Sequence, residues 1–89
     1  MSGIHVSLDI LMKVRADLDE LANKLEAQVR LTDNSIDEAS RSWNDVKFAE
    51  FQAQFEKDKE LIFPLISDVR EFNDGFLQDT INRLHNYLR

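Results

Sequence analysis

The sequence predicts an all-α fold, an antiparallel helix-turn-helix hairpin, and three observations support this prediction. Two long stretches of the 89-residue chain carry apolar residues at spacings of three and four, the period of an amphipathic helix. The polar segment Ser42-Trp43-Asn44-Asp45 separates these stretches near the middle of the chain. Two glycines and one proline are too few for the turns that a β protein needs. We therefore expect one helical-hairpin domain over residues 1–89.

The first helix is expected over residues of about 6–40. No glycine or proline interrupts residues 4–42, and Ser7 or Ser2 is suitably placed to cap the start of the helix. Asp9 would lie near the positive end of the helix dipole, where a carboxylate is stabilising. The apolar positions expected to form the packing face of this helix are Leu11, Val14, Leu18, Leu21 and Leu25.

The second helix is expected over residues of about 46–88. Pro64 lies inside it, where a proline removes a backbone hydrogen bond and clashes with the preceding turn at a cost of about 3 kcal/mol, so we expect a kink there. Beyond Gly75 the apolar phase slips by one residue, which indicates a stutter in the packing seam. The expected packing face comprises Phe48, Phe51, Phe55, Ile62, Leu65, Val69, Phe72 and Phe76.

The turn is expected over residues of about 41–45. Ser42 and Asp45 have the spacing of a capping box for the second helix, and Asn44 is a residue type that tolerates a left-handed backbone. Trp43 has two compatible interpretations. It closes the tip of the hairpin by packing over the turn, or it forms an interaction site with Asn44 and Asp45, since tryptophan is enriched in interface hot spots.

The apolar surface is wider than one facing helix can cover. The phenylalanines are most simply core residues of the hairpin, but apolar side chains also occur off the main stripes. These are Ile10, Val46, Leu61, Phe63 and Ile66. A second copy of the chain or a partner hairpin would cover them in a four-helix bundle, so we expect a homodimer or a heterodimer with another helical hairpin.

Composition argues against several classes of partner. The net charge is −6 and neither half is basic, so the electrostatic footprint of a nucleic-acid or anionic-lipid binder is missing. No segment reaches the roughly 20 apolar residues of a membrane span, and we expect no stable membrane insertion. The N-terminus lacks the pattern of a cleaved signal peptide, so we expect synthesis in the cytoplasm and any export by another route.

The same inventory predicts neither an enzyme nor a cofactor or metal site. The chain has no cysteine and no glycine-rich phosphate loop. Its carboxylates alternate with lysines around Asp58, as on a solvated helix face. The two histidines, His5 and His85, could meet at the open end of a hairpin, but a metal site normally needs three or four placed ligands.

Across its whole length the chain resembles the WXG family of type VII secretion proteins. The residues that carry the resemblance are Trp43 at mid-chain, its polar neighbours, and the Phe48, Phe51 and Phe55 stripe. Asp45 stands where the family has glycine. The family's export element, Tyr-x-x-x-Asp/Glu, is absent, because Tyr87 is followed only by Leu88 and Arg89. The resemblance implies a hairpin that dimerises into an antiparallel four-helix bundle.

The resemblance also implies a function, export without a cleaved signal peptide. The chain would be a substrate of a type VII-like system, or the dimerising or targeting partner of a larger exported effector, and its partners would include a secretion ATPase. The missing export element would then be carried by the partner. The alternative is a cytoplasmic helical adaptor or chaperone that binds a partner helix through its apolar face.

Overall fold

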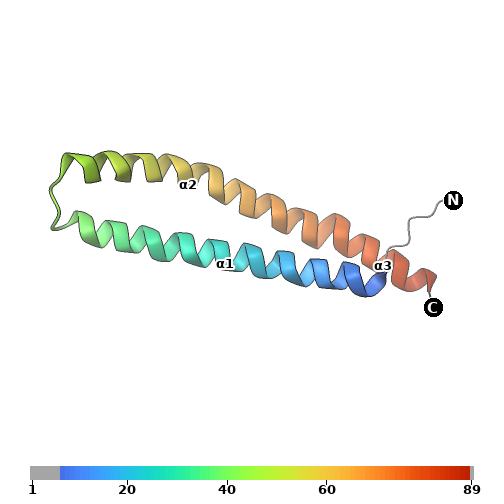
Figure 1. The fold of residues 1–89 in the computed structure, drawn as a ribbon. Helices are drawn as coiled ribbons and strands as arrows, with labels where there is room; N and C mark the ends of the chain where they lie inside the picture. Colours follow the sequence, from blue (N-terminus) through green and yellow to red (C-terminus); the bar gives the residue numbers. More distant parts are fainter. Residues whose placement is uncertain (1–6, 89) are drawn as a thin grey trace.

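The computed structural model describes residues 7–88 and confirms the all-α hairpin (Figure 1). Its elements are α1 (Leu8–Ser40), α2 (Val46–Phe72), the π-helical turn η1 (Asn73–Leu77) and α3 (Gln78–Tyr87). The described residues contain no strand. A four-helix bundle would need a second hairpin, and it stays a prediction.

The hairpin is long and thin. Helix α1 forms one arm, and α2, η1 and α3 together form a returning arm, so that the start of α1 lies beside α3 (Figure 1). The radius of gyration is 19.6 Å, against roughly 12 Å for a compact domain of this length. The principal extents of 63 × 20 × 16 Å leave room for only two helices in cross-section. Each arm therefore has one neighbour and can bury only one stripe of its surface.

The core lies mainly in the half of the hairpin that is farther from the turn. Its buried apolar side chains are Ala22, Ile66, Leu77 and Ile81, with Val29 just on the turn side of the middle of α1. Toward the turn the facing side chains, such as Phe48, are only half-buried. Figure 1 shows the two arms lying farther apart toward the turn than near the ends of the chain. The turn half consequently contributes less apolar burial than the half that holds the core.

The predicted packing faces divide into two groups. Seven residues are half-buried between the arms, namely Leu11, Leu18, Leu25, Phe48, Phe55, Ile62 and Val69. Six are exposed, namely Val14, Leu21, Phe51, Leu65, Phe72 and Phe76. The centre of the seam runs instead through neighbours such as Ala22 and Ile66. The true seam is thus rotated relative to the broad apolar stripe, and the exposed group forms one margin of that stripe.

The phase slip predicted near Gly75 coincides with η1. The backbone N–H of Gln78 donates to the carbonyl of Asn73 five residues earlier, as in a π-helix. The wider turn absorbs the slip, so that Leu77 and Ile81 return to the seam. Asn73 itself is the buried polar residue of this core, and its side-chain Nδ2 donates to the Arg15 carbonyl at 3.0 Å. This bond joins the returning arm to α1 and favours one register between them.

Pro64 does not interrupt α2, which continues as one helix from Val46 to Phe72. The ribbon does change direction along the middle of α2, bending toward α1 (Figure 1). Pro64 is exposed, and a proline on the outer surface of a helix produces a bend of this kind because its ring displaces the preceding turn.

The turn differs from the sequence expectation in its capping. Asp45, not Ser42, is the N-cap of α2, and its Oδ1 accepts a hydrogen bond of 2.7 Å from the Lys47 backbone N–H. The predicted capping box is therefore wrong, because α2 begins at Val46 and places Ser42 too early. No non-glycine residue in the described range has a positive φ, so Asn44 does not use the left-handed conformation. Ser7 occupies the N-cap position of α1 without a side-chain cap bond, and Ser2 lies outside the described residues.

Candidate interaction surface

Side-chain bridges between the two arms gather on one side of the seam. Arg15 contacts Asp74 at 3.0 Å, near the ends of the chain. Farther along, Arg70 contacts Glu26 at 3.0 Å, and closer to the turn Lys59 contacts Asp33 at 2.6 Å. We call this side the bridged face; its residues are Arg15, Asn23, Glu26, Asp33, Lys59, Arg70 and Asp74.

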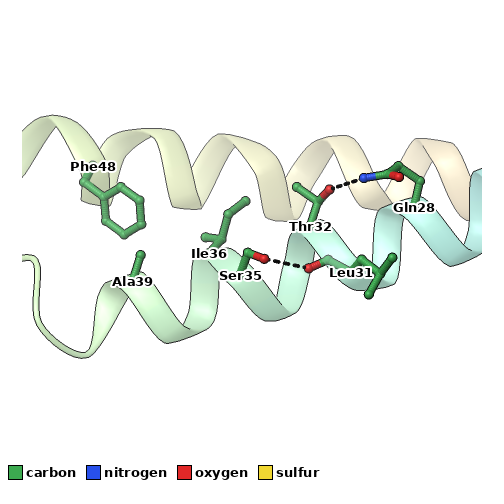
Figure 2. Close-up of a pocket in the computed structure, with 7 residues that line it drawn as sticks. All are labelled: Gln28, Leu31, Thr32, Ser35, Ile36, Ala39 and Phe48. Atoms are coloured by element: carbon green, nitrogen blue, oxygen red, sulfur yellow. Dashed lines mark hydrogen bonds between the residues drawn. The ribbon is translucent and has the colours of Figure 1, made fainter.

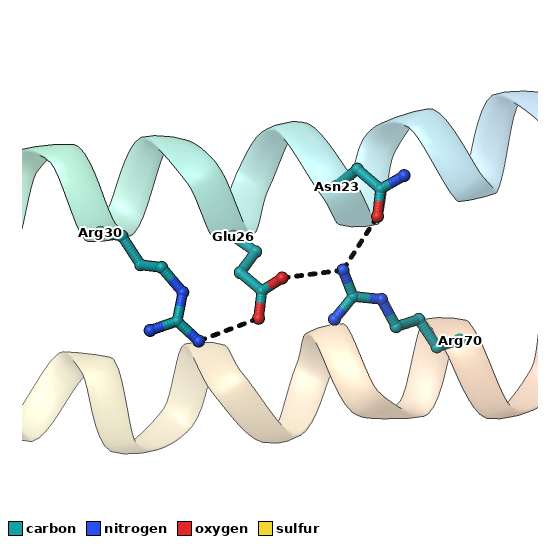
Figure 3. Close-up of polar contacts among 4 residues, drawn as sticks. All are labelled: Asn23, Glu26, Arg30 and Arg70. Atoms are coloured by element: carbon teal, nitrogen blue, oxygen red, sulfur yellow. Dashed lines mark hydrogen bonds and ion pairs between the residues drawn. The ribbon is translucent and has the colours of Figure 1, made fainter.

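The middle of the bridged face is a four-residue network (Figure 3). Arg70 donates from Nη2 to both Asn23 Oδ1 and Glu26 Oε1, at 3.0 Å each. Arg30 donates to the other carboxylate oxygen of Glu26 at 3.2 Å. The hydrogen bonds from Arg70 and then Arg30 lower the pKa of Glu26 below its usual range. The Glu26 carboxylate thus accepts hydrogen bonds from two guanidinium groups, one on each arm, and so joins the arms.

Lys59 has the corresponding role closer to the turn. Its amine contacts Asp33 across the arms and Glu56 one turn earlier at 2.8 Å. The hydrogen bond with Asp33, followed by that with Glu56, raises the pKa of Lys59. The amine also lies 5.7 Å from the centre of the Phe55 ring. The predicted packing face of α2 has no apolar residue between Phe55 and Ile62. Lys59 lies at the seam in this interval, while its neighbour Asp58 is exposed.

Exposed apolar side chains gather on the other side of the seam. On each arm the bridging residues are rotated from the seam in one direction, whereas exposed residues such as Val14 and Leu65 are rotated by about 40–100° in the opposite direction, at about 100° per residue. In an antiparallel pair of helices, residues rotated from the seam in the same sense lie on the same side of the pair, as the bridging residues of the two arms show. The exposed apolar residues of both arms are rotated in the opposite sense, so they share the other side. We call it the apolar face; its residues are Ile10, Val14, Leu21, Phe51, Leu65, Phe72 and Phe76.

The apolar face is well exposed along its length. Ile10 is 59% exposed at one end, and Leu65 is 54% exposed in the middle of α2. The Phe72 and Phe76 rings stack on each other with centroids 5.7 Å apart, and Phe76 remains 68% exposed. Large exposed apolar side chains gathered on one side in this way are typical of a protein–protein interaction site.

A hollow of about 250 Å³ lies nearer the turn, between α1 and the start of α2 (Figure 2). Leu31, Ile36, Ala39 and Phe48 supply its apolar lining, together with Gln28, Thr32 and Ser35. The polar side chains are already used within α1, because Gln28 donates to Thr32 and Ser35 donates to the Leu31 carbonyl. The lining therefore suits an apolar side chain better than a polar ligand.

The predicted turn motif lies at the tip of the hairpin and apart from most of the apolar face. Trp43 stacks on Phe48 with ring centroids 4.7 Å apart and an interplanar angle of 18°, yet 55% of its surface remains exposed. Asn44 and Asp45 are exposed beside it. Both interpretations of Trp43 are therefore compatible with the structure: it packs over the turn and it presents an aromatic surface to solvent.

No group of three or more metal-ligating side chains gathers among residues 7–88. His85 is exposed on α3, and His5 lies outside the described range. None of the helices within that range is both long and apolar enough to cross a membrane.

Comparison with protein-family models, with curated proteins and with solved structures gave no match. The resemblance to the WXG family therefore rests on the residues quoted from the sequence.

The Glu26 bridges make the stability of the hairpin depend on acid pH. A carboxylate whose pKa is lowered by folding stabilises the folded state above its ordinary pKa, and this stabilisation is lost as the pH falls through the folded-state value. We expect acidification to about pH 3 to lower the melting temperature of the wild-type chain more than that of a Glu26→Gln variant. Circular dichroism melts at neutral and acid pH measure both differences. Equal losses in the two proteins would show that Glu26 does not contribute in this way.

Proposed function

We propose that this chain is a helical-hairpin association protein whose apolar face pairs with a second helical hairpin to complete a four-helix bundle. The observation that carries the proposal is the difference between the two sides of the seam. One side is bridged by ion pairs within the chain, and the other presents large apolar side chains from both arms. Pairing on the apolar face would remove these side chains from water without breaking any of the bridges.

A stable interface of standard size buries about 800 Å² on each partner, so a partner hairpin would have to cover the apolar face along most of its length. The seven side chains of that face are each between 39% and 68% exposed, and all of them would be available to such a partner.

The setting that the sequence resemblance favours is a type VII-like secretion system. In this setting the chain is an exported substrate or the dimerising or targeting partner of a larger exported effector. Trp43 supports the targeting role, because a half-exposed aromatic ring at the tip of the hairpin is accessible to a secretion ATPase. The chain is then made in the cytoplasm and exported without a cleaved signal peptide.

The alternative is a cytoplasmic adaptor or chaperone, and one observation favours it. The hollow lined by Leu31, Ile36 and Phe48 is open to solvent and largely apolar, and it lies between α1 and the start of α2. An amphipathic helix from a client could place an apolar side chain there, as in helix-in-groove recognition. Export distinguishes this role from the first one.

Site-specific photo-crosslinking tests the association. A benzophenone amino acid in place of Leu65 would lie on the apolar face, and the same residue in place of the exposed Asp19 would lie on the opposite side of α1. We expect irradiated cells of the source organism to give a discrete adduct from position 65 and none from position 19. Adducts of equal yield from both positions, or none from either, would contradict the proposal.

Secretion tests the setting. We expect the tagged wild-type chain in the culture supernatant, dependent on the secretion ATPase, and a Trp43→Ala variant retained in cells. The substitution removes a stacked pair worth about 0.5–1.5 kcal/mol but no core contact, so the hairpin should still fold.

Two controls belong to this experiment. Val46→Ala, at a 74% exposed position beside the turn, should be exported normally, and a cytoplasmic marker reports lysis. Retention of the wild-type chain in the cells would favour the adaptor.

A further inference from the structure

We propose that the partner hairpin is a second copy of this chain, packed on the apolar face in an antiparallel, two-fold symmetric dimer whose axis passes beside Leu21. This inference rests on the proposed function and names the partner and its register. It is carried by two exposed stripes, one on each arm, that are each complementary to the same stripe running in the opposite direction.

On α1 the apolar face belongs to a stripe of residues at alternating spacings of four and three, the spacing of a helix–helix contact. We call it the α1 stripe; its residues are Ile10, Val14, Asp17, Leu21, Lys24, Gln28 and Leu31. All seven are exposed, whereas the seam of the hairpin runs through Ala22 and Val29. Helix α1 therefore has a second packing face that its own chain does not cover.

The α1 stripe matches itself when a second copy runs antiparallel to it with Leu21 at the centre. Ile10 of one copy then faces Leu31 of the other, and these side chains are 59% and 61% exposed in the single hairpin. Asp17 faces Lys24 of the other copy, and the two-fold symmetry forms this contact between opposite charges twice. Leu21 faces its own copy across the axis.

The returning arm has the same property. Its stripe runs over residues 58–83 at spacings of three and four and includes Leu65 and Phe76. Antiparallel pairing with a second copy places Leu65 against Phe76 and Asp58 against Arg83, again twice. Asp58 forms no ion pair among residues 7–88, and the Arg83 side chain is 80% exposed. Both charges are thus accessible to the other copy.

A single axis serves both arms, although neither stripe alone imposes this agreement. The centre of the α1 stripe is Leu21, and the centre of the returning stripe lies between Asp68 and Phe72. Within the hairpin, Asn23 accepts a hydrogen bond from Arg70 across the arms, so the two centres lie at nearly the same level along its length. One two-fold axis across the apolar face therefore forms the contacts of both arms at once.

This register leaves the tip of each hairpin uncovered. The α1 contact ends where Leu8 of one copy reaches the level of Asp33 of the other. On the returning arm the last contact is between Gln54, beside Phe51, and Tyr87 of the other copy. Trp43 lies beyond the described residues of the other copy, so the proposed targeting surface stays accessible in the dimer.

The chain has no cysteine, so a single introduced thiol tests the axis directly. Leu21→Cys places the thiol beside its own copy, and we expect a disulfide-linked dimer under mild oxidation. Asp19→Cys is the matched control, because Asp19 is also exposed and lies on the opposite side of α1. We expect it to crosslink at least about tenfold more slowly. Equal rates for the two variants, or no crosslink from Leu21→Cys, would overturn the inference.

An exchange of two charges tests the register. Asp17→Lys would bring like charges together twice in each dimer, so we expect the dissociation constant from sedimentation velocity to rise at least about tenfold. Adding Lys24→Asp restores opposite charges and should return this constant to within about threefold of wild type. Asp19→Lys makes the same change in net charge outside the stripe and should leave the constant within about twofold.

The combined variant also separates the dimer contact from ion pairs within α1. There Asp17 contacts Lys13 at 3.0 Å, and Lys24 contacts Glu20 at 2.6 Å. The combined variant loses both pairs, so a purely intrahelical role would make it dimerise more weakly than Asp17→Lys alone. That result, in variants whose circular dichroism shows intact helices, would overturn the register.

Sedimentation velocity of the wild-type chain alone completes the test. We expect a dimer at micromolar concentration, and a monomer throughout the micromolar range would overturn the inference. The photo-crosslink from position 65 keeps the two proposals apart. An adduct with a different protein, together with a monomeric chain, refutes the second copy and leaves the association standing, whereas no adduct contradicts the association itself.

Discussion

Two antiparallel helices can bury only the stripe of each that faces the other, and this constraint determines most features of the hairpin. A third or fourth helix would provide further surfaces for apolar side chains, but a molecule 63 Å long and 20 × 16 Å across has no third layer. The seam is consequently narrow, and the buried apolar side chains are few. Everything apolar beyond the seam remains in water unless another molecule covers it. Part of that surplus gathers on the apolar face, which is therefore the candidate interface.

The two margins of the seam are chemically distinct for a related reason. On the bridged face, long arginine and lysine side chains reach across to carboxylates on the other arm, and their stems cover part of the apolar surface. Exposed ion pairs of this kind stabilise the fold only modestly. They do pair the charges of the bridged face within the chain, so this face does not need a partner to cover it. The apolar face has no comparable bridges. The buried Asn73 side chain donates a hydrogen bond to the α1 backbone, and this bond favours one register of the two arms. A fixed register keeps the bridged face and the apolar face on opposite sides of the seam.

Much of the fold was accessible from the sequence, because helical periodicity and a polar mid-chain turn depend on local spacing. The phase slip beyond Gly75 was also visible, since a π-helical turn moves every later apolar residue by one position. The sequence did not show which residue of two neighbouring pairs, Leu65 and Ile66 or Leu21 and Ala22, is buried at the seam. Each pair lies within a stripe broader than the seam, and hydrophobicity alone favours the larger leucine over Ala22, although a small residue lets the arms approach.

The functional residues that sequence reasoning missed are those whose role depends on the opposite arm. Lys59 lies in a run of alternating charges that has the pattern of a solvated surface. Its side chain nevertheless lies at the seam, where its amine pairs with Asp33 of the other arm and lies over the Phe55 ring. Spacing within one helix does not contain this information.

The measurement that tests the central claim most directly is hydroxyl-radical footprinting of the chain, alone and in the assembly isolated from its source cells. The account predicts strong protection of Phe51, Leu65, Phe72 and Phe76 in the assembly. It also predicts little change at exposed Met12, which is rotated away from the apolar face on α1. Protection centred on Met12, or no protection of the four apolar residues, would show that the apolar face is not where this protein meets its partner.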